Sequence, residues 1–167
     1  MAISMYQASV PQLKKMLVNL SAILTKAQEH VAAKGMDGKV LVEARLFPDM
    51  FPLAKQVQIA CDQVKFGLAR LASVEAPKFD DTESTLAQLK ERIAKTIAFM
   101  DSIQPEQVDG TEAKEIRFSI KEWNFEFVGE QYVLTWVIPN FYFHVTTAYN
   151  ILRHNGVEIG KADYLGG

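Results

Sequence analysis

The residue of this chain best suited to chemistry is His144, because it lies in the middle of an apolar stripe. Between Pro139 and Gly156, apolar residues recur at offsets of three and four, which is the spacing of one helix face. His144 shares that face with Phe141, Val145, Ala148, Ile151 and Leu152. An imidazole in such a place is either a buried structural group bonded to a neighbour or the wall of a ligand site. The functional question depends on which of the two it is.

Four further residues are candidates to line a site with His144. Tyr142 and Tyr149 belong to the same predicted helix, whereas Asp49 and Asp62 lie near the start of another helix and in its first turns. A carboxylate from that helix could join the imidazole in a mixed metal site, since Asp and His both bind zinc or iron. The simpler interpretations are that the tyrosines pack, that Asp49 caps its helix, and that Asp62 pairs with a lysine three residues on.

Composition and motifs exclude several classes of function. The chain has 167 residues, 49% of them hydrophobic and 23% charged, which predicts one soluble globular domain over residues 1–167. A net charge of −2 provides no basic surface for nucleic acid or an anionic membrane. The single Cys61, the lack of a signal peptide and the lack of a long apolar run predict a cytoplasmic protein that does not span a membrane. No G-x-S-x-G elbow, P-loop or C-x-x-C motif is present.

The hydrophobic periodicity predicts four long amphipathic helices and one β-hairpin. The helices are expected over residues 9–34, 52–73, from Thr82 to about 104, and 129–154, the last with a kink at Pro139. Two capping patterns compete for the start of the first helix: Ser9 fits Pro11 in a first turn, and Ser4 with a kink at Pro11 remains an alternative. Glu83 is expected in the first turn of the third helix. The fold class is therefore mainly α, a four-helix bundle with a small β-hairpin before its last helix.

The hairpin is predicted from a change of period to two. If residues pair when their numbers sum to 243, Ile116 meets Phe127 and Phe118 meets Phe125 on one face. Arg117 then meets Glu126 on the other face, a favourable cross-strand pair. Residues 121 and 122 form the turn, although Lys-Glu is a poor two-residue turn sequence and a looser turn stays open.

Long motifs throughout the chain resemble one protein family. They are the segments 4–11 (SMYQASVP), 48–53 (PDMFPL), 57–60 (VQIA), 139–149 (PNFYFHVTTAY), 151–157 (ILRHNGV) and 160–166 (GKADYLG). On these motifs the chain is identified as a member of an uncharacterised domain-of-unknown-function family within the DinB/YfiT-like superfamily. The resemblance implies an up-down-down-up four-helix bundle that is often dimeric.

The better-known members of that superfamily bind a divalent metal with three histidines, and this chain departs from their pattern. Those members carry one histidine on the second helix and two on the fourth, four residues apart. Here residues 52–73 contain no histidine, and the residue four after His144 is Ala148. His30 and His154 lie on the first helix and at the far end of the fourth. We therefore predict no bound metal and no cofactor, and do not carry over the thiol-transferase chemistry of those members.

Three functions fit these observations. The first is a non-enzymatic module that binds a small molecule or a partner, with a degenerate metal site and a cavity lined by His144 and nearby aromatic rings. The second is a metal-dependent enzyme of the superfamily with a rearranged site of His144 and a carboxylate. The third is a purely structural homodimer joined through helix faces. We favour the first and expect it to act as a homodimer.

Overall fold

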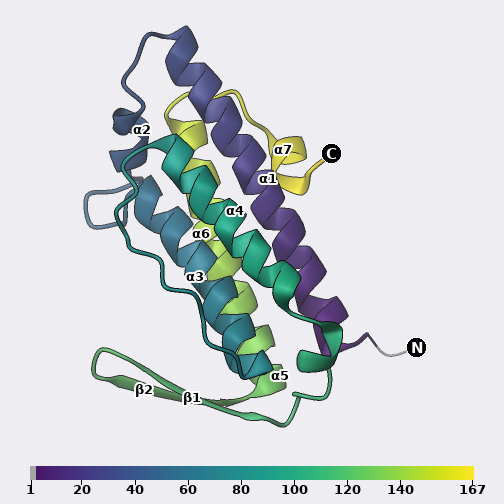
Figure 1. The fold of residues 1–167 in the computed structure, drawn as a ribbon. Coiled ribbons are helices and arrows are strands. Elements are labelled where there is room, and N and C mark those ends of the chain that lie inside the picture. The colour runs from purple at the N-terminus through teal and green to yellow at the C-terminus, as the bar shows by residue number, and fades with distance from the viewer. Residues whose placement is uncertain (1–2) are drawn as a thin grey trace.

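A computed structural model describes residues 3–167, and four long helices pack side by side in it with a β-hairpin at one end (Figure 1). The helices are α1 (Met5–Ala33), α3 (Leu53–Ala72), α4 (Leu86–Ser102) and α6 (Ile138–His154). α1 and α6 run one way and α3 and α4 the other, which is the up-down-down-up order (Figure 1). α3 packs against α4 and α6, and α1 packs against the same two helices, so the four enclose one apolar core. The predicted mainly α fold class is confirmed.

Short elements connect the long helices. They are α2 (Lys39–Glu43), the 3₁₀ turn η1 (Pro105–Gln107), α5 (Gly129–Gln131), the π-helix η2 (Tyr132–Val137) and α7 (Lys161–Leu165). α7 packs against α1, where the Lys26 Nζ lies 2.5 Å from the Asp163 carboxylate. Among residues 3–167, no helix combines the length and the apolar character that crossing a bilayer demands.

Helix α1 begins at the earlier of its two predicted starts. The Ser4 hydroxyl accepts a hydrogen bond from the Gln7 backbone N–H at 3.3 Å. The Tyr6 N–H donates to the Asp109 carboxylate at 2.7 Å, across 103 positions of sequence. Two donors of the first turn are thus satisfied ahead of Pro11, which lies inside the helix. The preference for Ser9 was wrong because the contribution of Asp109 could not be read locally.

Residues 73–85 connect α3 to α4, and we call them the crossover segment. Because the two helices run in the same direction, this segment must return along the length of the bundle (Figure 1). α4 has 17 residues and is therefore about 25 Å long. A helix that began at Thr82 would be about 6 Å longer and would leave only residues 73–81 to span roughly 30 Å, which is close to their full extension. The third helix accordingly begins at Leu86, where Thr85 and Gln88 form a capping box. Its predicted start at Thr82 was wrong, and Glu83 lies in the crossover segment.

The hairpin has the predicted register. Strands β1 (Glu115–Ile120) and β2 (Trp123–Val128) pair antiparallel, with Ile116 opposite Phe127 and Phe118 opposite Phe125. The connection is a two-residue turn, made possible by a left-handed Lys121 at φ 52°. On the opposite face the Arg117 guanidinium donates to the Glu126 carboxylate at 2.8 Å. Rings of Phe118, Phe125 and Phe127 pack against Trp136, which attaches the hairpin to the bundle.

The predicted last helix is helical over residues 129–154 but irregular ahead of Pro139. The wide turns of η2 precede the proline, and the Ile138 N–H bonds to the Val133 carbonyl, five residues back. Proline has no N–H and its ring needs room one turn earlier, so a stretch of π-helix accommodates it. α3 comes close at this point: a Cβ on Gly67 would lie 3.0 Å from the Val137 methyl groups.

Candidate functional site

The His144 ring is positioned by α6 and held by an amide on α3. Its Nδ1 lies 2.7 Å from Gln56 Oε1, while Gln56 Nε2 donates to the Phe51 carbonyl at 3.0 Å. Because the amide nitrogen donates to the Phe51 carbonyl, the amide oxygen is the atom that faces the ring. The ring nitrogen Nδ1 therefore carries the hydrogen and donates it, and Nε2 carries a lone pair.

Burial keeps this imidazole neutral. His144 is 9% exposed and Gln56 2%. Desolvation lowers the pKa of His144 from 6.5 to about 4, because a buried ring disfavours the charged form. At neutral pH the residue is thus a hydrogen-bond acceptor at Nε2 and not a group poised to exchange protons. The ring is a buried, bonded imidazole that keeps one nitrogen available.

The other predicted site residues have separate surroundings. The Tyr142 ring packs edge-to-face on Phe141, with centroids 5.3 Å apart, and Tyr149 packs in the same way on Tyr164 of α7 at 5.8 Å. Asp49 is exposed in the loop before α3 and does not cap that helix, whose N-cap is Pro52 without a side-chain bond. The structure therefore gives these residues packing or surface positions.

The residues around His144 do not fit the three-histidine metal site of the better-known superfamily members. On α3 the residue that meets the ring is Gln56, whose amide is bonded at both ends. Ala148, four residues after His144, is fully buried and offers no ligand atom. Nowhere between residues 3 and 167 do three His, Cys, Asp or Glu side chains gather in a way that could hold a metal ion. We derive no metal chemistry for this site.

A second polar centre lies between α3, α4 and the crossover segment, around the buried Arg92. Its Nη1 lies 3.0 Å from Asp81 and from Glu83, and its Nη2 lies 3.0 Å from Asp62. Lys65, only 3% exposed, also pairs with Asp62, at 2.9 Å. The predicted pair of Asp62 with the lysine three residues on is thus present, but it belongs to a buried network.

The network ties the crossover segment to the bundle. Lys55 pairs with Asp81 at 2.5 Å, and the Phe79 ring covers the Lys65 ammonium, 4.5 Å from its centroid. Burial alone would raise the pKa of Asp81, but hydrogen bonds and charge from Lys55 and Arg92 hold it below its usual value. Beneath these groups, burial raises the pKa of the Cys61 thiol to about 12, so it is unreactive.

Sequence reasoning missed Arg92, Lys65 and Gln56 as site residues. One signal for Arg92 was present in the sequence: it lies three residues after Leu89, and this spacing places a charged residue beside the apolar face of its helix. Its partners come from other segments, however, and only packing brings them together.

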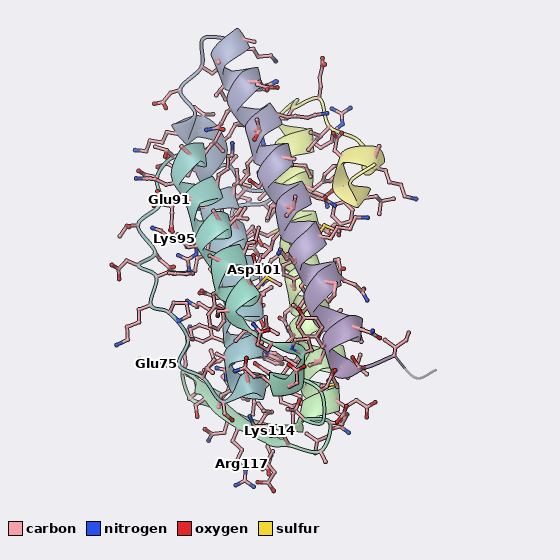
Figure 2. The ribbon with its side chains drawn as sticks, turned by 45° about the vertical axis from the view of Figure 1, so that its right-hand side comes forward. Glu75, Glu91, Lys95, Asp101, Lys114 and Arg117 are labelled. Carbon is pink, nitrogen blue, oxygen red and sulfur yellow. The ribbon has the colours of Figure 1, made fainter. Side chains whose placement is uncertain are left out.

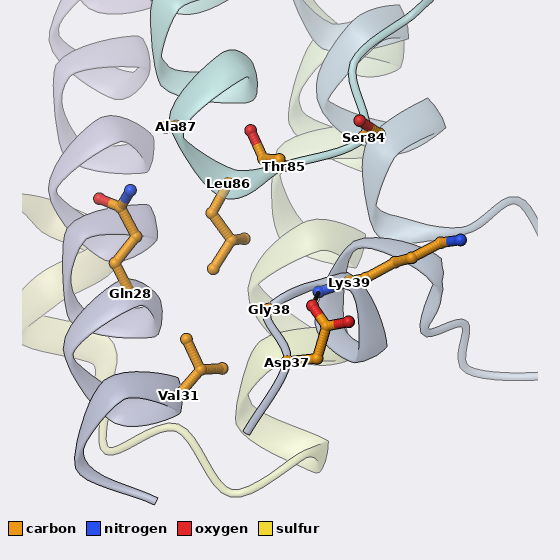
Figure 3. A pocket seen from close by; sticks show the side chains of 9 residues that line it. All are labelled: Gln28, Val31, Asp37, Gly38, Lys39, Ser84, Thr85, Leu86 and Ala87. Atoms are coloured by element: carbon orange, nitrogen blue, oxygen red, sulfur yellow. Dashed lines mark hydrogen bonds between the residues drawn. The ribbon is translucent and has the colours of Figure 1, made fainter. Parts of the chain in front are cut away.

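An apolar hollow with polar edges lies elsewhere, between α1, α2 and the start of α4 (Figure 3). It measures about 530 Å³, and the side chains of Val31 and Leu86 point toward each other across it. Its polar groups are bonded within the chain: Gln28 accepts from Lys90 at 3.1 Å, and Asp37 accepts from the Lys39 N–H at 2.9 Å. Within residues 3–167, neither of the two buried side-chain atoms that lack a hydrogen-bond partner belongs to a residue lining this hollow.

Comparison with known proteins places the chain in a family. The model of a domain of unknown function, DUF1993, matches residues 5–165. A crystal structure described as a DinB family member protein from Shewanella denitrificans is 45% identical, with a TM-score of 0.88, over 97% of this chain and 92% of that one. No curated protein matches. The chain therefore belongs to the DUF1993 family, whose fold here is DinB-like.

Proposed function

We propose that this protein is a non-enzymatic binding module whose recognition group is the Nε2 lone pair of His144. The observation that carries the proposal is the Gln56–His144 bond, which fixes the ring, together with the burial that keeps it neutral. A neutral, oriented imidazole accepts a hydrogen bond from an N–H or O–H group of a ligand. The exposed Phe143, whose ring lies edge-to-face on His144 at 5.2 Å, provides an adjacent apolar contact. The ligand expected is therefore a small molecule or partner segment that combines a donor with an apolar group.

The binding function is favoured over the rearranged metal enzyme because the residues proposed as metal ligands are already bonded to other side chains. Asp62, the carboxylate such a site would use, is already engaged by Lys65 and Arg92. His144 presents its Nδ1 to an amide and has Ala148 in place of a second histidine. The site thus resembles a degenerate metal site in which a hydrogen bond to the Gln56 side-chain amide takes the place of a bond to a metal ion.

A screen by thermal shift tests this proposal with a matched pair of variants. His144→Asn keeps a donor near the Nδ1 position for Gln56 but removes the acceptor at Nε2, and His154→Asn makes the same change at an exposed helix end. We expect metabolites that raise the melting temperature of the wild type and of His154→Asn to leave His144→Asn unchanged. Equal shifts in all three proteins, or no stabilising compound for the wild type, would contradict the proposal. Elemental analysis of untagged protein addresses the rival: one tightly held metal ion per chain would favour the enzyme.

We further propose a homodimer in the cytoplasm. Exposed aromatic side chains on two adjoining helices support the dimer: Phe66 on α3 is 40% exposed and Phe143 on α6 is 58% exposed. The single buried Cys61 suits a reducing compartment. Light scattering should give twice the mass of the chain, and Phe143→Asp should give a monomer. A monomeric wild type at micromolar concentration would rule out the dimer.

A further inference from the structure

A polar pocket between the crossover segment and α4 is separate from the His144 site. It measures about 340 Å³. Its lining is charged or polar except for Phe79 and comprises Lys78, Phe79, Asp80, Thr82, Glu83, Gln88, Glu91, Arg92 and Lys95. Figure 2 shows Glu91 and Lys95 on α4 beside the crossover segment. Such a lining favours a hydrophilic ligand, in contrast to the mostly apolar pockets that bind drug-like molecules.

One lining group lacks an acceptor. The Arg92 side chain is 1% exposed, and its two terminal nitrogens contact Asp62, Asp81 and Glu83. Its third nitrogen, Nε, carries one N–H, which is buried and has no partner among the described residues. Buried donors in proteins are almost always paired, because desolvating an unpaired one is costly. An acceptor from outside the chain would satisfy this donor.

The charges around Arg92 indicate that the acceptor is neutral. Three carboxylates are in ion pairs there (Asp62, Asp81 and Glu83), and three cations balance them (Lys55, Lys65 and Arg92). A further anion would leave an excess of negative charge beside a buried group, which is unfavourable. A hydroxyl oxygen accepts the hydrogen bond without adding charge. Thr82 and Gln88 add a hydroxyl and an amide to the lining, so one ligand with several hydroxyl groups meets several partners.

We propose that this pocket binds a small neutral polyhydroxy molecule of monosaccharide size, with one hydroxyl oxygen accepting from the Arg92 Nε–H. The pocket holds roughly eleven water volumes of about 30 Å³ each, which is sufficient for a monosaccharide. Because no lining residue belongs to the Gln56–His144 pair, this inference goes beyond the proposed function and does not depend on it.

Titration calorimetry and saturation-transfer NMR with D-glucose, D-ribose and myo-inositol test the inference, with acetate and phosphate as charged competitors. We expect at least one polyol to bind the wild type and the anions not to displace it. Thr82→Trp fills the pocket from the crossover segment without removing an ion pair of Arg92, and should weaken polyol binding at least tenfold. Arg92→Lys keeps the charge but lacks the Nε–H, and should also weaken it. His144→Asn should leave it unchanged, which separates this site from the proposed one.

Three results would overturn the inference. They are the absence of binding by all three polyols at millimolar concentration, binding of the anions alone, and equal polyol affinity in the wild type and Thr82→Trp. A crystal structure with a lone water on Arg92 Nε in saturating polyol would overturn it as well.

Discussion

Replacing Arg92 by Met should detach the crossover segment from the bundle. The methionine has a similar length and no charge, so it removes the cation that Asp62, Asp81 and Glu83 share while filling part of the space. Removing one partner of a buried ion pair costs about 3–5 kcal/mol, since the other partner is left buried and uncompensated.

The loss should lie near the lower end of that range. Asp81 and Asp62 have side chains that are 39% and 25% exposed, and each retains a lysine, Lys55 and Lys65 respectively. Only Glu83, 12% exposed, loses its cation and keeps just the Gln58 amide. We therefore expect the free energy of unfolding to fall by about 3 kcal/mol, which lowers the melting temperature by about 6–12 °C in a domain of this size.

Urea unfolding measures the loss of stability, and the single Cys61 reports on the crossover segment. The thiol is fully buried, so its reaction with a disulfide reagent in native buffer requires local opening. Arg92→Met should increase the rate of that reaction more than tenfold.

The matched control is Lys95→Met on the same helix, where the lysine is 58% exposed and pairs with Glu91 four residues away. It should change stability by less than about 0.5 kcal/mol and leave the thiol rate unchanged. If both variants behaved alike, or if Arg92→Met lost less than about 1 kcal/mol, the reasoning about a buried network would be wrong.

Three further predictions concern other parts of the molecule. The pKa of His144 is about 4 in the fold and about 6.5 in the unfolded chain, so the unfolded state binds more protons between these values. The stability contributed by the neutral ring is complete above pH 6.5 and is lost as the pH falls to 4, by up to about 3 kcal/mol; His144→Asn, measured by urea unfolding across that range, should remove this slope. Gly129→Ala would place a Cβ 1.9 Å from the Thr111 carbonyl oxygen and should cost about 2 kcal/mol or more in chemical unfolding, whereas Gly160→Ala, with no atom within 4 Å, should be nearly neutral. Lys114 donates to the carbonyls of Arg70 and Leu71 at the end of α3, so Lys114→Met should destabilise the protein by about 1–2 kcal/mol in thermal unfolding.

The elements that sequence reasoning predicted well are those with a strong local period. The pairing of Ile116 with Phe127 followed from alternation alone, and the inward faces of the long helices followed from spacings of three and four. The predicted start of the third helix was too early because Thr82 and Glu83 resemble the first residues of a helix. The true capping box at Thr85 was overlooked, and the direction of α4 demands an extended segment before it.

The contacts of the candidate sites could not be predicted in the same way. His144 was identified from its place on an apolar stripe, but its partner Gln56 is 88 positions away. Arg92 and Asp62 are 30 positions apart and meet only because α3 and α4 run in parallel. A periodicity shows which face of a helix is inward, whereas the partner of a buried polar group depends on the register between helices.

Both polar centres depend on α3, and this bears on how the bundle is specified. Gln56 meets α6 through His144, while Asp62 meets α4 through Arg92. Apolar side chains tolerate many alternative packings of two helices. A shift of α3 by one turn would separate both polar pairs at once. It would leave the buried His144 ring without its amide and the buried Arg92 guanidinium without Asp62, which is costly. Buried ion pairs add little stability compared with apolar residues of the same volume. We therefore attribute to Gln56 and Asp62 the selection of one register for α3, and this register orients His144 Nε2 and Arg92 Nε for any ligand.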